Sequence, residues 1–363
     1  MNHLFRFFRF YFPRYRWIKF TIRPAHFKTL FWQTLGLGIM FYPHPVQAVE
    51  ITPFYTQNQS PLVLIFGLPS IGEASLVPVG RLDARLIFDL ANNFVKDFSP
   101  RGEAIFLDVE TQRLALDFRY GIARKMEIGI QIPYVTISAG FLDETVEGIH
   151  GVLGSAQGHR TEDYNGQRAY GRNELKYYYI RDGKFLLNGH AAEGLGDIRL
   201  MGGWQLYQEP SRAVALRVSL KLPTADSNLL LGSGSTDLAL WVTARNDFKM
   251  KKGHISIFGG AGIMGMTRGE VLPDQQRNHV WFGNIGAGWS PVSWFAFKMQ
   301  IDGSTPFYND SDLRELNHDA ALLTFGVTFG FSPQTTLDIG VSEDIDVSTA
   351  PDVNFHFALR HRF

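Results

Sequence analysis

Residue types that could act together on a substrate gather in one polar stretch of the chain, residues 139–173. The stretch combines histidine, serine and carboxylate side chains, which are the components of a Ser–His or Asp–His pair. The candidates are Asp143, Glu144, His150, Ser155, His159 and Asp163. No serine among them lies in a nucleophile motif such as Gly-x-Ser-x-Gly. A lipid-modifying enzyme at the rim of the molecule is therefore the least favoured function, and we expect no catalytic residues.

Two further motifs lack the context that their chemistry requires. Gly260–Gly265 (GAGIMG) matches the dinucleotide-binding pattern, but no helix pattern follows it and no acidic residue lies about 20 positions on. Acidic residues also recur in predicted loops without completing a calcium-binding loop. They are Asp310, Asp312, Glu315, Glu343, Asp344 and Asp346. The chain has no Cys, which excludes disulfides and thiolate metal sites. We expect no metal and no cofactor.

Charged residues instead recur at every second position of extended segments whose other positions are apolar. Between Leu82 and Leu90, for example, apolar residues alternate with Asp83, Arg85 and Asp89. This period of two is typical of a strand that separates lipid from a wet interior. The candidate lumen-facing residues are Asp83, Arg85, Asp117, Arg119, Glu127, Arg199, Arg217, Lys221, Asp237, Lys298, Asp302 and Asp338. They could line a pore or fill a closed interior, and their mixed sign predicts weak ion selectivity for an open lumen.

The last strand of the chain has the same two faces and ends on an aromatic residue. Its polar face carries Asn354, His356, Arg360 and Arg362, and an edge strand of a soluble sandwich could share this pattern. The terminal aromatic residue makes the segment resemble the closing strand and C-terminal assembly signal of a bacterial outer-membrane barrel. The residues of this signal are Phe355, Phe357, Leu359 and Phe363. The resemblance implies outer-membrane lipid and the barrel-assembly machinery as partners.

Residues 80–363 predict one all-β domain, a transmembrane antiparallel up-and-down β-barrel. Tight turns alternate with long polar loops, which is typical of short periplasmic turns and long extracellular loops. Counting strands backwards from Phe363 gives about fourteen, or twelve if the hairpin at 174–190 stands outside the membrane. Residues 49–79 show no alternation and contain the apolar run Pro61–Pro69. They are either a periplasmic lead-in or a segment inserted into the lumen, and the need to bury the apolar run favours insertion.

Residues 1–48 predict a secretory signal peptide. They contain seven basic residues, no acidic residue, an apolar run at 30–42 and a small residue, Ala48, at the exit. The run is shorter than the roughly 20 residues of a spanning helix. The leader holds seven of the 35 basic residues, so the mature chain has 28 basic against 35 acidic residues and a net charge of −7. This charge argues against nucleic acid as a partner, and Sec-type export to the outer membrane of a Gram-negative bacterium is expected.

Three stretches go beyond general barrel patterning. They are residues 58–69 (NQSPLVLIFGLP), 194–200 (GLGDIRL), and 222–224 (LPT) followed by 232–238 (GSGSTDL). Together they resemble a bacterial family known only as a domain of unknown function, whose members are thought to be outer-membrane barrels. The last two are also similar to MetA-like outer-membrane proteins of phenol-degradation pathways, although Ala225 stands where those proteins commonly have Gly. The resemblance implies a channel for small, partly hydrophobic compounds and brings no catalytic residues.

The favoured function is thus a passive channel or transporter for small molecules in the outer membrane. A closed structural or assembly barrel without a pore is the alternative, because paired charges could also fill the interior.

Overall fold

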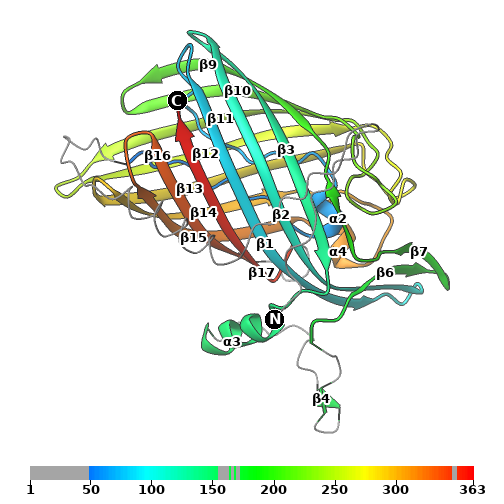
Figure 1. The fold of residues 1–363 in the computed structure, drawn as a ribbon. Coiled ribbons are helices and arrows are strands. Elements are labelled where there is room, and N and C mark those ends of the chain that lie inside the picture. Colours follow the sequence, from blue (N-terminus) through cyan, green and yellow to red (C-terminus); the bar gives the residue numbers. More distant parts are fainter. Residues whose placement is uncertain (1–48, 154–162, 165–166, 169–171, 346–349) are drawn as a thin grey trace, which may run out of the picture. The chain divides into compact units, whose positions relative to one another are not determined.

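The alternating segments of the sequence form antiparallel strands that close into a ring (Figure 1). The computed structural model describes residues 49–153, 163–164, 167–168, 172–345 and 350–363, so the predicted signal peptide lies outside the described residues. Twelve strands form the ring. They are β1 (Leu82–Phe98), β2 (Glu103–Ala123), β3 (Met126–Ser138), β9 (Arg199–Glu209), β10 (Arg212–Lys221), β11 (Asp237–Lys249), β12 (His254–Met266), β13 (His279–Val292), β14 (Phe295–Ser304), β15 (Ala320–Gly330), β16 (Thr335–Asp344) and β17 (Val353–Arg362).

The first and last strands close the ring. β1 pairs with β17 in an antiparallel register that begins at Asp83↔Arg362. The other ring neighbours follow one another in the chain, except that β3 pairs with β9 because the segment between them leaves the ring. The predicted antiparallel barrel is therefore confirmed. Its strand number is the one expected when the hairpin at 174–190 stands outside.

That hairpin extends one end of the barrel because β2 is longer than a membrane requires. β2 has 21 residues, whereas a spanning strand needs only about 9–11. Its second part pairs with β3, and its first part, Glu103–Asp108, pairs with β6. The strands outside the ring are β6 (Lys176–Arg181), β7 (Lys184–Asn188) and β8 (Ala192–Leu195).

Short elements occupy the long connections. α3 (Asp143–Leu153) follows β3, and at its start Leu142 and Val146 pack against Val353 of β17. The other elements of the connections are β4 (Asp163–Tyr164), β5 (Gln167–Arg168) and α4 (Arg314–Asn317). In the described part of the chain, no helix has the length and apolarity needed to cross a bilayer.

The two faces of the wall differ as the period of two predicts. On the outer face Leu86, Leu116, Phe297 and Phe357 are exposed, which suits contact with lipid tails. The residues between them point inward and are buried, as Ile87 on β1 illustrates. The interior is thus filled rather than open along these strands.

Connection lengths distinguish the two ends of the barrel. Tight turns join ring strands at one end, at residues 124–125, 210–211, 250–253, 293–294 and 331–334. The opposite end carries the connections 139–198, 222–236, 267–278, 305–319 and 345–352, together with the tip of the β1–β2 hairpin. Because short turns of such barrels are periplasmic, we call the first end periplasmic and the second extracellular.

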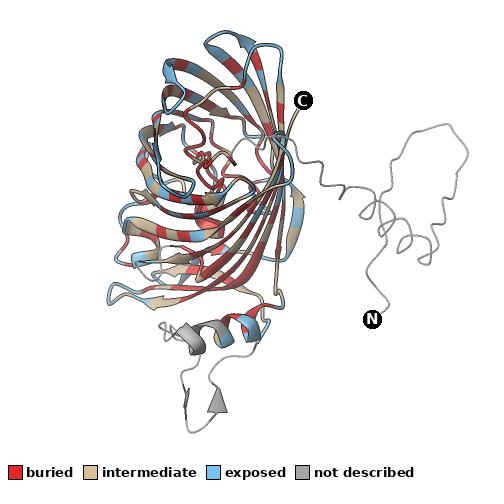
Figure 2. Cartoon of the chain, turned by 90° about the vertical axis from the view of Figure 1, so that its left-hand side faces the viewer, coloured by how far each residue is buried: buried red, intermediate tan, exposed pale blue. Residues whose placement is uncertain are grey.

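Residues 49–79, called the plug below, fill the inside of the ring (Figure 2). The plug starts at the periplasmic end, where the Val49 amide donates to the Ser293 carbonyl oxygen over 2.7 Å. It reaches its tip at α2 (Pro61–Leu64) and then turns back. At its end, Val79 forms an isolated bridge with Gly121, close to the turn at 124–125. Both ends of the plug therefore lie at the periplasmic end of the barrel.

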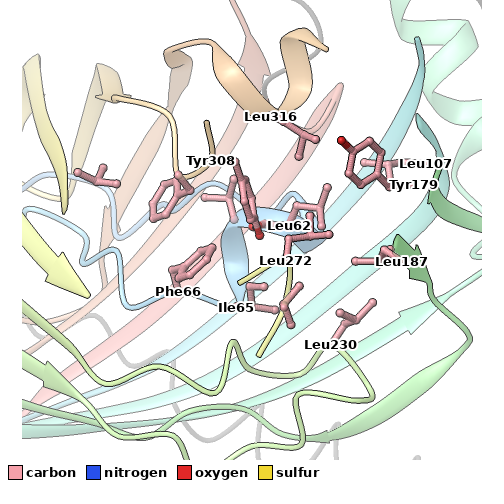
Figure 3. Packing of buried hydrophobic residues seen from close by; sticks show 14 of the residues in the cluster. Leu62, Ile65, Phe66, Leu107, Tyr179, Leu187, Leu230, Leu272, Tyr308 and Leu316 are labelled. Carbon is pink, nitrogen blue, oxygen red and sulfur yellow. The ribbon is translucent and has the colours of Figure 1, made fainter. Parts of the chain in front are cut away.

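The tip of the plug is held in an apolar cluster at the extracellular end. Phe66 stacks on Phe307 with ring centroids 4.9 Å apart, and the Tyr308 hydroxyl donates to the Leu62 carbonyl oxygen over 2.9 Å. Tyr179 of β6 belongs to the same cluster, as Figure 3 shows. The extracellular loops and the β6–β7 hairpin thus cover the plug tip and exclude water from it.

Candidate functional site: the plugged lumen

The structure places all twelve sequence-derived lumen candidates on the inner side of the ring. Asp302 is half-buried and the other eleven are buried. Each has a charged or hydrogen-bonding partner in the described residues. Such partners are required because an unpaired charge out of water costs several kcal/mol. Most of these residues belong to four groups, each of which surrounds a different part of the plug.

Lys221 organises the first group, near the tip of the plug. Its Nζ lies 2.8 Å from an Asp197 carboxylate oxygen and 3.1 Å from one of Asp237, and it donates to the Ile65 carbonyl oxygen over 3.1 Å. Asp237 in turn accepts the Gly67 amide over 2.7 Å. One buried lysine on β10 therefore links two wall carboxylates to the backbone of the plug.

The second group surrounds Glu73 in the returning arm of the plug. Arg360 of β17 binds this carboxylate through both guanidinium nitrogens, at 2.8 and 2.9 Å, and Arg85 of β1 binds it at 2.8 Å. Burial alone would raise the pKa of Glu73, but Arg360 and Arg85 hold that pKa well below its usual range. Bidentate guanidinium pairs are among the strongest charge-assisted contacts in proteins. Glu73 is thus an ionised anchor of the plug.

A second plug carboxylate lies beside this group. Glu50 is 2.7 Å from Arg362 and 3.3 Å from Arg245, measured between the nearest nitrogen and oxygen atoms. Arg362 also reaches Asp83 of β1 at 3.2 Å. The two arms of the plug therefore end in one arginine-rich region of the wall, near the periplasmic end.

The third group holds the last residues of the plug. Arg217 donates through Nε to the Glu73 carbonyl oxygen over 2.9 Å and pairs with Glu127 at 2.6 Å. Glu127 accepts the Val77 amide over 2.8 Å. Next to this group, Arg119 pairs with Asp117 at 3.1 Å. Here the wall supplies both donors and acceptors to the backbone of the plug.

The fourth group holds the entering arm. Lys298 donates to the Thr52 carbonyl oxygen over 3.0 Å, pairs with Asp338 at 2.9 Å and lies 3.9 Å from the centre of the Phe54 ring. Asp302 accepts the Thr56 hydroxyl over 3.0 Å. The plug is therefore fixed along its whole length by side chains of the wall.

Backbone groups of the plug find their partners on the wall because the plug has almost no secondary structure of its own. Arg199 donates to the carbonyl oxygens of Phe66 and Leu68, both at 3.2 Å. The Trp241 indole donates to the Ile71 carbonyl oxygen over 2.8 Å. Buried backbone groups without partners are costly, so these contacts determine the path of the chain through the lumen.

Inward glycines let the plug approach the wall. A Cβ at Gly288 would lie 2.5 Å from Cγ2 of Ile51, and one at Gly260 would lie 2.7 Å from Cγ2 of Ile71. Gly260 begins the Gly-x-Gly-x-x-Gly match, which the structure places within β12. The glycines of this match therefore serve packing in a strand.

The filled lumen leaves little free space. A cavity beside Thr56 and Asp302 offers about 30 Å³ to water, which is room for one or two molecules. As it stands, this cavity is too small for a metabolite. Passage of a solute would require movement of the plug.

Other buried polar residues of the lumen were not among the sequence candidates. Asp89 pairs with Arg113 at 3.3 Å and with His356 at 2.7 Å, and Arg113 donates to Gln131 over 2.8 Å. The alternation on β1, β2 and β17 already placed Asp89, Arg113 and His356 on polar faces. Glu73 carries no periodic signal, and its one hint is that Glu50 and Glu73 are the only charged residues in the sequence of residues 49–79.

The candidates for other chemistry have different positions. The side chain of His150 and all of His159 and Ser155 lie outside the described residues, whereas Asp143 accepts a hydrogen bond from Asn92 over 3.0 Å. Asp310 and Asp312 pair with Arg181 at 3.1 Å and Arg101 at 2.9 Å. Asp346 is also outside the described residues, among which no group of three metal-ligating side chains occurs.

The C-terminal residues lie on the lipid-facing side. Phe357, Leu359 and Phe363 are exposed, and Phe355 is half-buried. Phe363 ends the chain beside β1, where its amide donates to the Leu82 carbonyl oxygen over 2.8 Å. The four aromatic and aliphatic residues are thus available to lipid along the closing strand.

Residues 34–363 match the model of a family described as proteins of unknown function, DUF3187. The chain belongs to this family. The resemblance drawn from residues 58–69, 194–200 and 222–238 is therefore confirmed at the level of an outer-membrane barrel family of unknown function. A search of curated proteins finds no match.

Two solved structures are similar to this chain at low sequence identity. The COG4313 outer membrane channel from Pseudomonas putida F1 is 10% identical, with a TM-score of 0.52 over 80% of this chain and 98% of that chain. The toluene transporter TbuX of Ralstonia pickettii is 13% identical, with a TM-score of 0.36 over 79% and 90%. The first likeness supports an outer-membrane barrel fold for the family. It says nothing about the solute.

Proposed function

We propose that this protein is a passive outer-membrane channel for small molecules whose lumen is closed by its own plug. The observation that carries the proposal is how the plug is held. Apart from its apolar tip, the plug is seated by hydrogen bonds and ion pairs on a polar wall, and both its ends lie at the periplasmic end. Polar contacts can be exchanged for water, so the plug can leave through the periplasmic mouth without any break in the ring.

A closed structural barrel is the second candidate, and the filled lumen supports it. Ion pairs such as Lys298–Asp338 and Arg119–Asp117 connect wall residues to one another and would persist without the plug. The two candidates differ in what remains when the plug is removed: a water-filled path or a collapsed interior.

Conductance in planar bilayers separates these two candidates. The mature chain and a variant lacking residues 49–79 are compared, after heat-modifiable migration on SDS gels has shown that both barrels are folded. We expect rare openings for the mature chain and steady conductance for the variant. If neither folded protein conducts current, the channel is rejected and the closed barrel is favoured.

The solute class suggested by the phenol-degradation resemblance can be tested in the same system. Liposome swelling with neutral phenols and with sugars of similar size compares their permeation through the plug-free barrel. Faster entry of the phenols than of the sugars would support a path for partly hydrophobic compounds. Equal rates of entry for phenols and sugars would contradict a preference for partly hydrophobic compounds.

A further inference from the structure

The charge of the lumen wall near the periplasmic end is not balanced by the wall itself. Six arginines point into this region, and each lies within 4.0 Å of one or more carboxylates. They are Arg85, Arg119, Arg217, Arg245, Arg360 and Arg362. Among the described residues, four of the carboxylates that they contact belong to the wall. These are Asp83, Asp117, Glu127 and Asp247. The wall alone therefore carries two uncompensated positive charges here.

The plug supplies the missing negative charge. Glu50 and Glu73 are the plug carboxylates that these arginines bind, and with them the region becomes neutral. The two terminal guanidinium nitrogens of Arg360 bind the two carboxylate oxygens of Glu73, at 2.8 and 2.9 Å. The guanidinium fork matches the geometry of any planar carboxylate and of phosphate oxygens. The plug thus occupies a built anion site with its own side chains.

We propose that the open channel conducts anionic solutes that carry carboxylate or phosphate groups, and that Glu50 and Glu73 hold the places of those groups while the channel is closed. This inference rests on the proposed channel function. When the plug leaves, its two carboxylates leave with it, and the arginines face the water-filled path. Rings of arginine or lysine select for anions in pores. The mixed charges of the whole wall predict weak ion selectivity, whereas this proposal predicts selectivity for anions because the uncompensated charges at the periplasmic end are positive.

The same arrangement explains how a solute could favour the open state. An anion that reaches Arg360 or Arg362 competes directly with the plug carboxylates for the same guanidinium groups. A ligand that binds the open state but not the closed one shifts the equilibrium toward opening. A neutral solute has no such effect through these residues.

Reversal potentials in a KCl gradient test the inference on the full mature chain. In the variant Glu50→Gln/Glu73→Gln the plug loses both charged anchors, so openings become more frequent. We expect these openings to favour chloride over potassium by at least about fivefold, because about fivefold is the change expected from each of the two uncompensated charges beside an aqueous path. Adding Arg360→Gln and Arg362→Gln should return the ratio toward one. Glu193→Gln on β8, outside the ring and exposed, is the matched control and should behave as the unaltered protein.

The outcomes separate the inference from the function on which it rests. Openings without a preference for chloride, or with a preference for potassium, would overturn the inference and leave the channel standing. Absence of current from every folded variant and from the plug-free barrel would overturn both.

If the double variant does not fold, a second experiment keeps all the charges of the plug and the wall. It uses the variant Ala74→Cys, at a buried plug residue, as the single labelling site, because the chain has no other Cys. Citrate should speed maleimide labelling of this cysteine several-fold at constant ionic strength, whereas spermidine should not. Equal effects of the two ions would contradict the proposal.

Discussion

Lys221 is the residue whose removal should release the tip of the plug with the least change to the wall. Its side chain is 1% exposed and contacts two carboxylates and the Ile65 carbonyl oxygen. Lys221→Met keeps most of the apolar stem and removes only the ammonium group. The variant leaves Asp197 and Asp237 in a buried site without their shared cation.

The size of the effect follows from this loss of pairing. Breaking a buried ion pair by removing one partner destabilises a protein by about 3–5 kcal/mol. Asp197 keeps hydrogen bonds from the amides of Thr224 and Ala225, both at 2.9 Å, so the lower end of this range applies. A loss of about 3 kcal/mol corresponds to roughly a hundredfold larger fraction of molecules with the plug released.

Labelling of a plug cysteine measures that fraction. With the reporter Ala74→Cys, a maleimide reacts only when the returning arm leaves the lumen, so the rate follows the open population. We expect Lys221→Met to raise the labelling rate roughly a hundredfold over the reporter alone. Lys125→Met, at an exposed lysine in the turn 124–125, is the matched control and should leave the rate unchanged.

A partner variant tests the physical reason. Asp237→Asn in the Lys221→Met background removes one of the two unpaired charges, and its amide oxygen can still accept the Gly67 amide. The labelling rate should therefore fall back by tenfold or more. If Lys221→Met labels no faster than the reporter, the ion pairs at the tip do not hold the plug, and the reasoning is refuted.

Three further predictions concern packing, pH and assembly. Gly288→Ala places a Cβ 2.5 Å from Cγ2 of Ile51, so it should speed labelling of the plug reporter, whereas Gly148→Ala in α3, with open space around it, should not. The folded-state pKa of Glu73 is lowered, so ionised Glu73 stabilises the seated plug fully above about pH 5, where an ordinary glutamate is also ionised. This stabilisation is lost as the pH falls further, and protease protection of the plug that is unchanged down to pH 2 would contradict this. Removal of Phe363 should lower the yield of heat-modifiable barrel in the outer membrane several-fold, and an unchanged yield would show that assembly does not use this residue.

The ring could be predicted from the sequence because its signal is local. Along β1, Leu82 and Leu86 face lipid while Asp83 and Arg85 face inward, and this alternation can be read without knowing any partner strand. The strand number was harder to predict. The hairpin at 174–190 has the alternation of a strand pair, but it joins the part of β2 that exceeds the thickness of a membrane.

The seating of the plug could not be predicted in the same way. Residues 49–79 follow no period, and their contacts are made with side chains far away in sequence, such as Gln300, which accepts the Phe54 amide 246 residues from it. Composition indicated only that the apolar run at Pro61–Pro69 needs burial. That Glu73 would meet Arg360 depends on the closure of the whole ring, which no local pattern reveals.

The position of the plug also sets the order of events in biogenesis. Glu73 is synthesised early, yet its partner Arg360 lies 287 residues later in the chain, in β17. The arginines that bind Glu73 come from β1 and β17, so its binding site is complete only after these two strands have paired. Since entry and exit lie on the same side, the amino-terminal arm can dock as a folded-back loop from the periplasm. The full set of contacts of Glu73 can therefore form only after the ring has closed, so the barrel is expected to close before the plug is fully seated.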